Sequence, residues 1–458
     1  MAEKIKVGLS EIRDARELGY PKMITLGFQH MFAMFGATVT VPLLTGLSVS
    51  TTLLCAGCAT LLFHLITKGK VPAFLGSSFA FLAGYAAIAP MIDGKANLEM
   101  LPYACLGVVF SGILYLILAG LIKIAGIRNV MKFFPPVVTG PIIMAIGLGL
   151  APSAVTNCAT CWPLAITALV LVILFSVFGR GMVKIIPILL GIIGSYLTAI
   201  ILGNCLGYEG FAVDFSTVEQ AAWIGLPIVW DQTVFGGVKD SGLAVTAIIA
   251  IMPIALATMM EHIGDISAIS ATCKQNFLKD PGLNRTLLGD GIGTMLASLF
   301  GGPANTTYGE NTGVLALSKV YDPKVVRIAA YFAIALSFCP KFAAIITSIP
   351  MAIVGGISFV LYGMISAIGV RNVVEAKVDF SKSRNTLIAG VILVVSLGLT
   401  DGLTFAIGDF TITLTALALA SLAGIILNVI FPEKDFSAEN AFESVTDSKQ
   451  INLEDETI

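Results

Sequence analysis

Long apolar stretches follow one another along almost the whole chain, and short polar segments separate them. Clear examples are "MITLGFQHMFAMFGATVTVPLLTG", "IIPILLGIIGSYLTAIILG" and "TLIAGVILVVSLGLT". A helix that crosses a bilayer needs roughly 20 mostly apolar residues, whereas a transmembrane strand alternates polar and apolar positions over roughly 10 residues. The sequence shows long apolar runs rather than this alternation, so it predicts an all-α polytopic membrane protein.

Fourteen stretches of this kind can be counted along the chain. We expect the spans near 24–47, 50–67, 72–91, 101–125, 133–151, 163–179, 183–204, 242–266, 286–300, 306–318, 325–347, 350–369, 385–400 and 410–431. Three of them are too short or too rich in Gly, Pro and Thr to be ordinary spans. The third and the tenth are predicted to be broken by short strand-like segments.

Composition and charge placement support this interpretation. Of the 458 residues, 56% are hydrophobic and 12% are charged, and the mean hydropathy is +0.91; an ordinary globular chain carries about 25% charged residues. With the N-terminus inside and the spans alternating, all but three of the 27 Lys and Arg residues fall on the cytoplasmic side, the exceptions being Lys95, Lys239 and Lys341. Cytoplasmic loops carry an excess of basic residues, so fourteen spans with both termini inside are predicted.

The segments between and around the spans complete the predicted organisation. We expect a cytoplasmic segment over 1–23, a first seven-span repeat over 24–206, an extracellular loop over 207–240, a second repeat over 241–431, and a disordered acidic cytoplasmic tail over 432–458. The first residues lack a short apolar core followed by a small-residue cleavage site, so no signal peptide is expected.

Cysteines suggest little further chemistry. Eight are scattered through the chain, mostly in apolar segments, where cysteine packs as a small hydrophobic residue. Cys158 and Cys161, in "CATC", are expected in an outside loop and could form a disulfide or a metal pair. A single CxxC without a second pair is weak evidence for either.

Two polar segments inside the span region resemble each other. "LGSSFAF" at 75–81 follows Pro72, and "NTTYGE" at 305–310 follows Pro303. Aligned, 77–80 and 306–309 each read as two hydroxyl residues, an aromatic and a small residue. Seven spans separate the two segments, so the second half of the chain is predicted to lie upside down relative to the first. Such inverted repeats, with broken helices meeting near the bilayer midplane, are typical of secondary transporters.

Four acidic residues fall within or near the spans. They are Glu261, Asp265, Asp290 and Glu310. A charged side chain at the bilayer centre costs about 2.5–3.5 kcal/mol or more and is usually functional. Glu261 and Asp265 share one helix face, and two buried like charges favour keeping a proton on one of them, as proton-coupled transport requires. The alternative is that these acids lie near span ends and are solvated.

Histidines leave similar alternatives open. His30, in "FQHMF", and His262, beside Glu261, could carry protons, or they could be packed residues held by hydrogen bonds. His64, near the inner end of the second span, is expected to be structural.

Several longer motifs resemble one known family. "FQHMFAMFGATVTVPLLTGL", "KVPAFLGSSFAF", "EHIGD", "DPGLNRTLLGDGIGT" and "GGPANTTYGENTGVLALSKVYDP" are similar to the bacterial uracil permeases of the nucleobase–ascorbate transporter family, also called nucleobase:cation symporter-2. The resemblance covers nearly the whole chain. It implies fourteen spans in two inverted repeats that form a core domain and a gate domain, and a homodimer in the bacterial cytoplasmic membrane.

The resemblance also implies a substrate site. Glu261 and Glu310 are expected to hold the polar edge of the base, and backbone near Phe79 and Gly309 to complete the contacts. Phe79 and Tyr308 offer aromatic faces to the ring. Asp265 is also expected at the substrate. His30, Asn311 and Asp290, together with Glu261 and Asp265, are expected to support the site or to carry protons. Tyr362 is expected to line the site from the gate side.

The sequence departs from the uracil pattern at one position. Where this chain reads "EHIGD", uracil permeases typically have His in place of Asp265, whereas xanthine and urate members commonly carry Asp there and at the equivalent of Asp290. Those members usually carry Gln in place of Glu310. Because Glu310 is expected to contact the substrate, the prediction is a proton-coupled uracil importer working by alternating access, with a xanthine or other oxopurine symporter as the alternative. The sequence does not decide between proton and sodium coupling.

Other classes of protein fit less well. An anion transporter of the related sulfate-transporter fold should offer a basic residue near the broken helices, and the chain has none between Lys70 and Lys95 or between Arg285 and Lys319. An intramembrane aspartyl protease needs two facing aspartates, one of them in a Gly-x-Gly-Asp arrangement, and 287–290 reads Leu-Leu-Gly-Asp. We therefore expect no enzyme activity, cofactor, metal or nucleic acid; the expected partners are a nucleobase, a proton, membrane lipid and a second copy of the chain.

Overall fold

The computed structural model describes residues 7–8, 10–92, 95–208, 210–399, 402–407 and 410–431. The tail predicted over 432–458 lies outside the described residues. The first half of the chain contains η1 (Ala15–Leu18), α1 (Tyr20–Thr45), α2 (Val49–Ile66), β1 (Leu75–Ser77), α3 (Leu82–Ile88), α4 (Leu101–Ala125), α5 (Ile127–Met131), α6 (Pro136–Cys158), α7 (Trp162–Phe178), α8 (Met182–Ile185), α9 (Pro187–Ala199) and η2 (Ile200–Cys205).

A connecting segment and the second half follow. They contain α10 (Ser216–Gln220), η3 (Trp230–Gln232), α11 (Val234–Gly237), α12 (Ser241–Ile251), η4 (Met252–Ile254), α13 (Ala255–Cys273), η5 (Leu278–Gly282), α14 (Leu283–Leu299), β2 (Asn305–Thr307), α15 (Gly309–Ser318), α16 (Pro323–Ser337), α17 (Pro340–Thr347), α18 (Met351–Glu375), α19 (Ser383–Gly398), β3 (Leu403–Ile407), β4 (Phe410–Leu414) and α20 (Ala416–Ile430).

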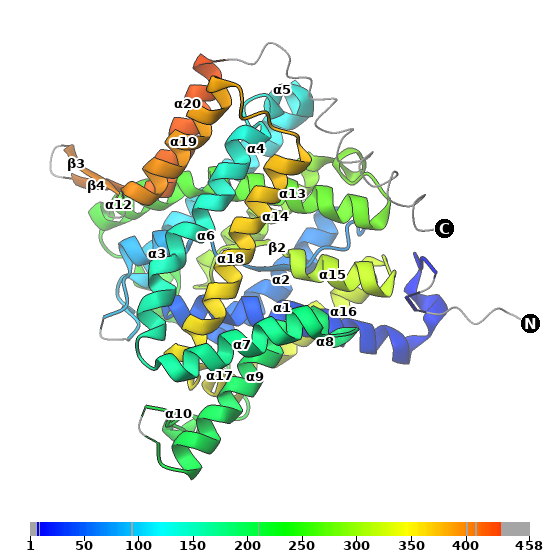
Figure 1. The fold of residues 1–458 in the computed structure, drawn as a ribbon, viewed down its shortest axis with the longest axis vertical. Coiled ribbons are helices and arrows are strands. Elements are labelled where there is room, and N and C mark those ends of the chain that lie inside the picture. Colours follow the sequence, from blue (N-terminus) through cyan, green and yellow to red (C-terminus); the bar gives the residue numbers. More distant parts are fainter. Residues whose placement is uncertain are drawn as a thin grey trace, which may run out of the picture.

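The helices pack in two groups. One group joins α1, α2, α4, α12, α14, α15 and α16, and the other joins α6, α7, α9, α18, α19 and α20. Figure 1 shows α6 and α18 running alongside each other through the middle of the molecule. Gly147 of α6 permits this approach, because a Cβ there would strike the backbone carbonyl of Tyr362 on α18. α13 contacts both groups, through α15 on one side and α6 and α20 on the other.

Seven of the described helical stretches are long and apolar enough to cross a membrane, or eight if the bent pair α16 and α17 is one span. The predicted mostly helical, polytopic membrane fold is therefore confirmed in its coarse form. The span expected over 325–347 is broken in the structure, because α16 and α17 meet at 89°. Pro340 opens α17, and a proline cannot supply the N–H that would continue α16.

The last predicted span also begins later than expected. Residues 410–414 form β4, which pairs antiparallel with β3, and the helix α20 begins only at Ala416. In "FTITLT" each threonine follows a phenylalanine, isoleucine or leucine. β-Branched and aromatic residues favour an extended, pleated strand over a helix. Thr415 then accepts a hydrogen bond from the Ala418 N–H and starts the helix.

The two predicted broken segments form short strands that pair with each other. Leu75–Ser77 and Asn305–Thr307 pair antiparallel in three positions, with Gly76 opposite Thr306. The pairing extends by one hydrogen bond at each end, from the Ser78 N–H to the Ala304 carbonyl (2.8 Å) and from the Tyr308 N–H to the Phe74 carbonyl (3.0 Å). All six strand residues are buried. The non-helical backbone is therefore satisfied inside the protein, which is the condition for tolerating it at membrane depth.

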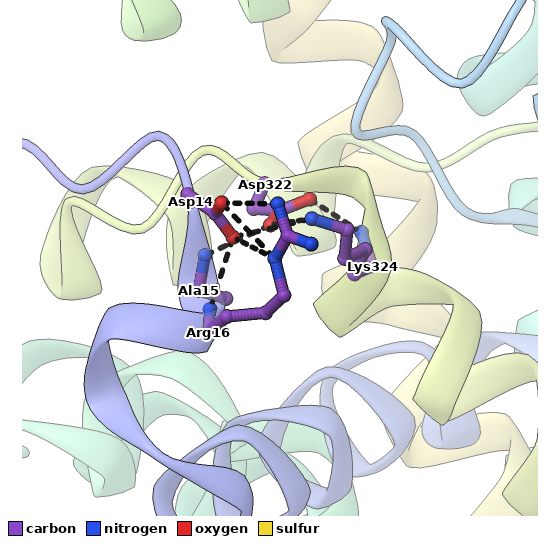
Figure 2. Close-up of polar contacts among 5 residues, drawn as sticks. All are labelled: Asp14, Ala15, Arg16, Asp322 and Lys324. Carbon is purple, nitrogen blue, oxygen red and sulfur yellow. Dashed lines mark hydrogen bonds and ion pairs between the residues drawn. The ribbon is translucent and has the colours of Figure 1, made fainter.

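The segment before α1 is fastened to the start of α16 (Figure 2). Asp322 caps α16 by accepting from the Lys324 N–H, and its second oxygen accepts from the Ala15 N–H at 2.8 Å. Asp14 lies 2.6 Å from the Arg16 guanidinium and 3.2 Å from the Lys324 ammonium. These contacts lower the pKa of Asp14, with the Arg16 hydrogen bond as the largest cause. The N-terminal segment is thus tied to the helix that follows α15.

Candidate functional site

A helix begins directly after the paired strands β1 and β2. α15 begins at Gly309, directly after β2, and Tyr308 at its N-cap offers no side-chain cap. The first N–H groups of a helix have no intrahelical partner and carry partial positive charge. Gly309 itself is exposed, although the strand before it is buried. The first turn of α15 therefore begins at an accessible point and has no side-chain cap.

Asp265 of α13 lies near this point, and Glu261 precedes it by one turn on the same helix. Glu261 and Asp265 are one helical turn apart and both are partly exposed, and Gly264 between them is exposed with open space where a Cβ would be. A Cβ on Gly309 would lie 4.0 Å from the Asp265 Oδ1. Glu310, also partly exposed, follows Gly309 in the first turn of α15. The absence of side chains at the two glycines leaves room for a flat ligand beside the carboxylates.

A chain of polar contacts leads from this face into the core. The Thr307 hydroxyl donates to Asp265 Oδ2 at 3.0 Å and lies 3.4 Å from His262 Nδ1. The same ring nitrogen lies 3.0 Å from Asp290 Oδ2, and neither His262 nor Asp290 is exposed to solvent. His262 Nε2 and both oxygens of Asp290 are buried without a hydrogen-bond partner among the described residues, so the 3.0 Å approach of Asp290 to His262 is an ion-pair contact rather than a hydrogen bond. Asp265 on the accessible side is therefore linked to a fully buried His–Asp pair.

A second pair lies on the far side of α15. Asn311 donates its amide to His30 Nδ1 and to the His30 carbonyl, both at 3.1 Å, and both side chains are buried. Because Nδ1 accepts, a neutral His30 carries its hydrogen on Nε2. That nitrogen and the Asn311 Oδ1 have no partner among the described residues. This contact joins α1 to the first turn of α15.

The aromatic residues differ in their surroundings. Phe79 follows β1 and lies edge-on to Tyr362 of α18, with ring centroids 6.3 Å apart at 77°. The Tyr362 hydroxyl is buried without a partner among the described residues. Tyr308 follows β2, is 4% exposed, and donates its hydroxyl to the Ser77 carbonyl at 2.9 Å. Phe79 thus faces α18 of the other helix group, whereas Tyr308 is held against β1.

The carboxylates have no basic side chain as partner. No ion pair with Lys or Arg is found for them among the described residues, and one oxygen of Glu261 is buried without any hydrogen-bond partner. Within the same part of the chain, no cluster of three or more His, Cys, Asp or Glu residues could hold a metal ion. Charged side chains are costly inside a membrane, and those that occur there usually mark the path of a ligand, an ion or a proton.

Apart from Glu261, Glu310 and Tyr308, which are placed above, the sequence-predicted residues thus fall into three neighbourhoods. Asp265 and Gly309 meet directly; Asp290 joins Asp265 only through two residues outside the predicted site, Thr307 and His262. His30 meets Asn311, and Phe79 meets Tyr362. Thr307 was signalled only by its place in the repeat, and its contact with Asp265 had no signal in the sequence. Cys158 and Cys161 are both free thiols, so no disulfide joins them.

The fold is similar to that of solved membrane proteins. The transmembrane domain of a cyanobacterium bicarbonate transporter, BicA, has the same fold: the TM-score is 0.60 at 14% identity, with 92% of this chain and 99% of that chain covered. SLC26A9 matches with a TM-score of 0.64 at 12% identity over 91% of this chain and 66% of that one. At such identities the likeness concerns the fold alone.

Sequence comparison gives the family. The chain belongs to the Permease family, whose model matches residues 21–405. It is 41% identical to the uracil permease of Bacillus caldolyticus, over 94% of this chain and 97% of that protein, and 40% identical to the uracil permease of Bacillus subtilis, over 90% and 92%. The uracil permease of Escherichia coli (strain K12) is 36% identical over 94% and 96%. The resemblance inferred from the motifs is confirmed, and the protein is a multi-pass integral membrane transporter.

Proposed function

We propose that this protein imports uracil across the bacterial cytoplasmic membrane, coupled to the entry of protons. The single observation that carries the proposal is the approach of Asp265 to Gly309 at the uncapped first turn of α15, where Glu310 also lies, with Glu261 one helical turn before Asp265. Relatives of 36–41% identity over most of the chain bear the name uracil permease. Their names support the choice of ligand, and the chemistry of the site supports it separately.

Uracil offers two ring N–H donors and two carbonyl acceptors. Carboxylates accept from N–H groups, which suits Glu261 and Glu310. Backbone N–H groups at the start of a broken helix donate to carbonyl oxygens, which suits Gly309 and the backbone near Phe79. The Phe79 and Tyr362 rings would close the apolar side of the flat base. Asn311 and His30 would support the first turn of α15 from behind.

Proton coupling follows from the charge balance. Four carboxylates, of which only Asp290 has a histidine beside it and none has Lys or Arg among the described residues, cannot all be ionised in a medium of low dielectric constant. The buried His262–Asp290 pair would hold one proton and communicate with Asp265 through Thr307. Glu261 would exchange its proton as the base binds and leaves. Transport then requires that the site open alternately to the two sides of the membrane.

We further propose fourteen spans arranged as two inverted repeats, with both termini in the cytoplasm. The antiparallel pairing of β1 with β2 supports this arrangement, since two equivalent segments related by a twofold axis in the membrane must cross in opposite directions. The two helix groups would act as core and gate domains, and a homodimer would hold the gate still in the lipid bilayer.

Xanthine is the second candidate, because Asp265 and Asp290 match the oxopurine members of the family. The open space at Gly264 would accept the second ring of a purine. Binding of uracil, xanthine, guanine and urate to the purified protein would separate the two candidates. Xanthine binding without uracil binding would replace the first proposal with the second.

The transport proposal is tested in proteoliposomes. We expect labelled uracil to accumulate when an inward proton gradient is imposed, and a sodium gradient alone to give no accumulation. Glu261→Gln, which keeps the shape of the side chain but cannot release a proton, should abolish accumulation against a gradient. If the variant still accumulates uracil, Glu261 does not couple transport to protons.

A further inference from the structure

Tyr308 does not occupy the same kind of position as Phe79, its counterpart in the aligned segments. Its ring lies against β1, where a Cβ on Gly76 would come within 2.5 Å of the Tyr308 Cε2 and Cζ atoms. Its hydroxyl donates to the Ser77 carbonyl at 2.9 Å and accepts from Thr38 at 3.3 Å. A group so enclosed is poorly placed to stack on a ligand.

The contacts of Tyr308 close a small buried network. Ser77 donates its own hydroxyl to the Thr38 carbonyl at 3.0 Å. Thr38 belongs to α1, Ser77 to β1, and Tyr308 joins β2 to α15. All three side chains are at least 96% buried, with exposed fractions of 0%, 0% and 4%. One side chain from the second half of the molecule therefore fixes two elements of the first half.

This network reaches the site through the backbone. Gly309 follows Tyr308 directly and starts α15, so the place of its N–H depends on where the Tyr308 side chain is held. Ser77 precedes the backbone near Phe79 that is expected to bind the base. The strand pair has only three pairing positions, and so short a ladder has little stability of its own.

We propose that Tyr308 is a positioning residue, whose hydroxyl pins the two broken segments together so that both present their backbone donors to the same ligand. Gly76 contributes to the same arrangement, since only glycine at this position leaves room for the Tyr308 ring. The inference rests on the proposed function for its ligand. It assigns to Tyr308 a role other than packing on the substrate ring, and it predicts that the hydroxyl matters more than the aromatic face.

Tyr308→Phe removes the hydroxyl and keeps the ring, so it separates the two roles. We expect uracil to bind about tenfold more weakly, because the buried Ser77 carbonyl loses its donor. If Tyr308 only stacks on the base, the affinity stays unchanged. Tyr103→Phe is the matched control, since Tyr103 of α4 is also 4% exposed and its hydroxyl accepts from the Lys239 and Asp240 N–H groups, away from the two strands. It should bind uracil as the wild type does.

Hydrogen exchange of the ligand-free protein tests, without a substrate, whether Tyr308 holds the two strands together. Peptides that cover 74–80 and 304–310 should exchange about tenfold faster in Tyr308→Phe than in the wild type or in Tyr103→Phe. Gly76→Ala should produce the same faster exchange, because the added methyl group displaces the ring. Unchanged exchange in both variants would overturn the proposal.

The two measurements keep the proposals apart. Faster exchange with unchanged uracil affinity would overturn the positioning role, because the strands would then be loosened without effect on the ligand. If the wild type binds no uracil, the proposed function fails, while the exchange experiment still decides whether Tyr308 pins the strands.

Discussion

Thr307→Val tests whether the polar chain between Asp265 and Asp290 acts on ligand binding. Thr307 is 2% exposed, and its hydroxyl is the only atom that links Asp265 Oδ2 (3.0 Å) to His262 Nδ1 (3.4 Å) among the contacts of the described residues. Valine has the same shape and is also β-branched, so the backbone pairing of residue 307 with Leu75 should be kept. The substitution removes the hydroxyl and little else.

The expected loss can be worked out from this one hydrogen bond. A hydrogen bond to a charged group contributes about 1.5–3 kcal/mol, and each 1.4 kcal/mol corresponds to about a factor of ten in affinity. Complete loss of the orientation of Asp265 would therefore weaken binding about 10- to 100-fold. We expect about tenfold, because Asp265 is partly exposed and water can replace the hydroxyl.

Isothermal titration of the purified protein with uracil measures this effect, and a thermal unfolding curve of the ligand-free protein checks the fold. Thr306→Val is a matched control, because Thr306 lies in the same strand, is 3% exposed, and has a hydroxyl without a hydrogen-bond partner among the described residues. The control should bind uracil with an affinity within about a factor of two of the wild type. Equal affinities for Thr307→Val and Thr306→Val would refute the link between Asp265 and the buried pair.

Three further predictions concern other parts of the molecule. Asp322→Ala removes the cap of α16 and the acceptor of the Ala15 N–H, so the free energy of unfolding should fall by about 1–3 kcal/mol, measured by thermal unfolding, whereas Asp322→Asn should keep most of it. The lowered pKa of Asp14 means that its contribution is fully present well above the ordinary value of about 4 and is lost progressively as pH falls from there through the lower value of the folded protein. Limited proteolysis should therefore find the N-terminal segment equally protected at neutral pH and at about pH 6, and less protected in Asp14→Asn. Gly264→Leu should abolish uracil binding without lowering the melting temperature, because the leucine would fill the open space between Glu261 and Asp265; retained binding would mean that the ligand lies elsewhere.

The sequence predicted those features that depend on local chemistry. Apolar runs identified helices such as α4 and α6, and the Pro-preceded, hydroxyl-rich segments at 75–81 and 305–310 identified the broken ones, because helices and extended segments have different backbone requirements. The hairpin over 403–414 was missed, since an apolar stretch of that length suits either structure. The bend between α16 and α17 was also missed, because a proline shows where a helix ends and not the direction in which the chain continues.

The candidate site was predictable only in part. Glu261 and Asp265 could be placed on one face because they are one turn apart. His262 points about 100° away from Glu261 on that helix, and nothing in the chain indicates that α14 brings Asp290 to its ring. The role of Tyr308 was equally hidden, because its contacts with Ser77 and Thr38 join residues more than two hundred positions apart. Contacts between distant elements depend on packing, and one sequence contains no direct record of it.

The arrangement separates two tasks that a coupled transporter must perform with the same acidic groups. Glu261, Asp265 and Glu310 are partly exposed, so they can meet a ligand, whereas Asp290 and His262 are closed off from solvent. Asp265 belongs to both sets through Thr307. A proton held by the buried pair would therefore influence the ligand only through the orientation and charge of Asp265. If the proposed coupling holds, we therefore expect the Thr307 hydroxyl to matter as much for transport as a carboxylate that contacts the ligand directly.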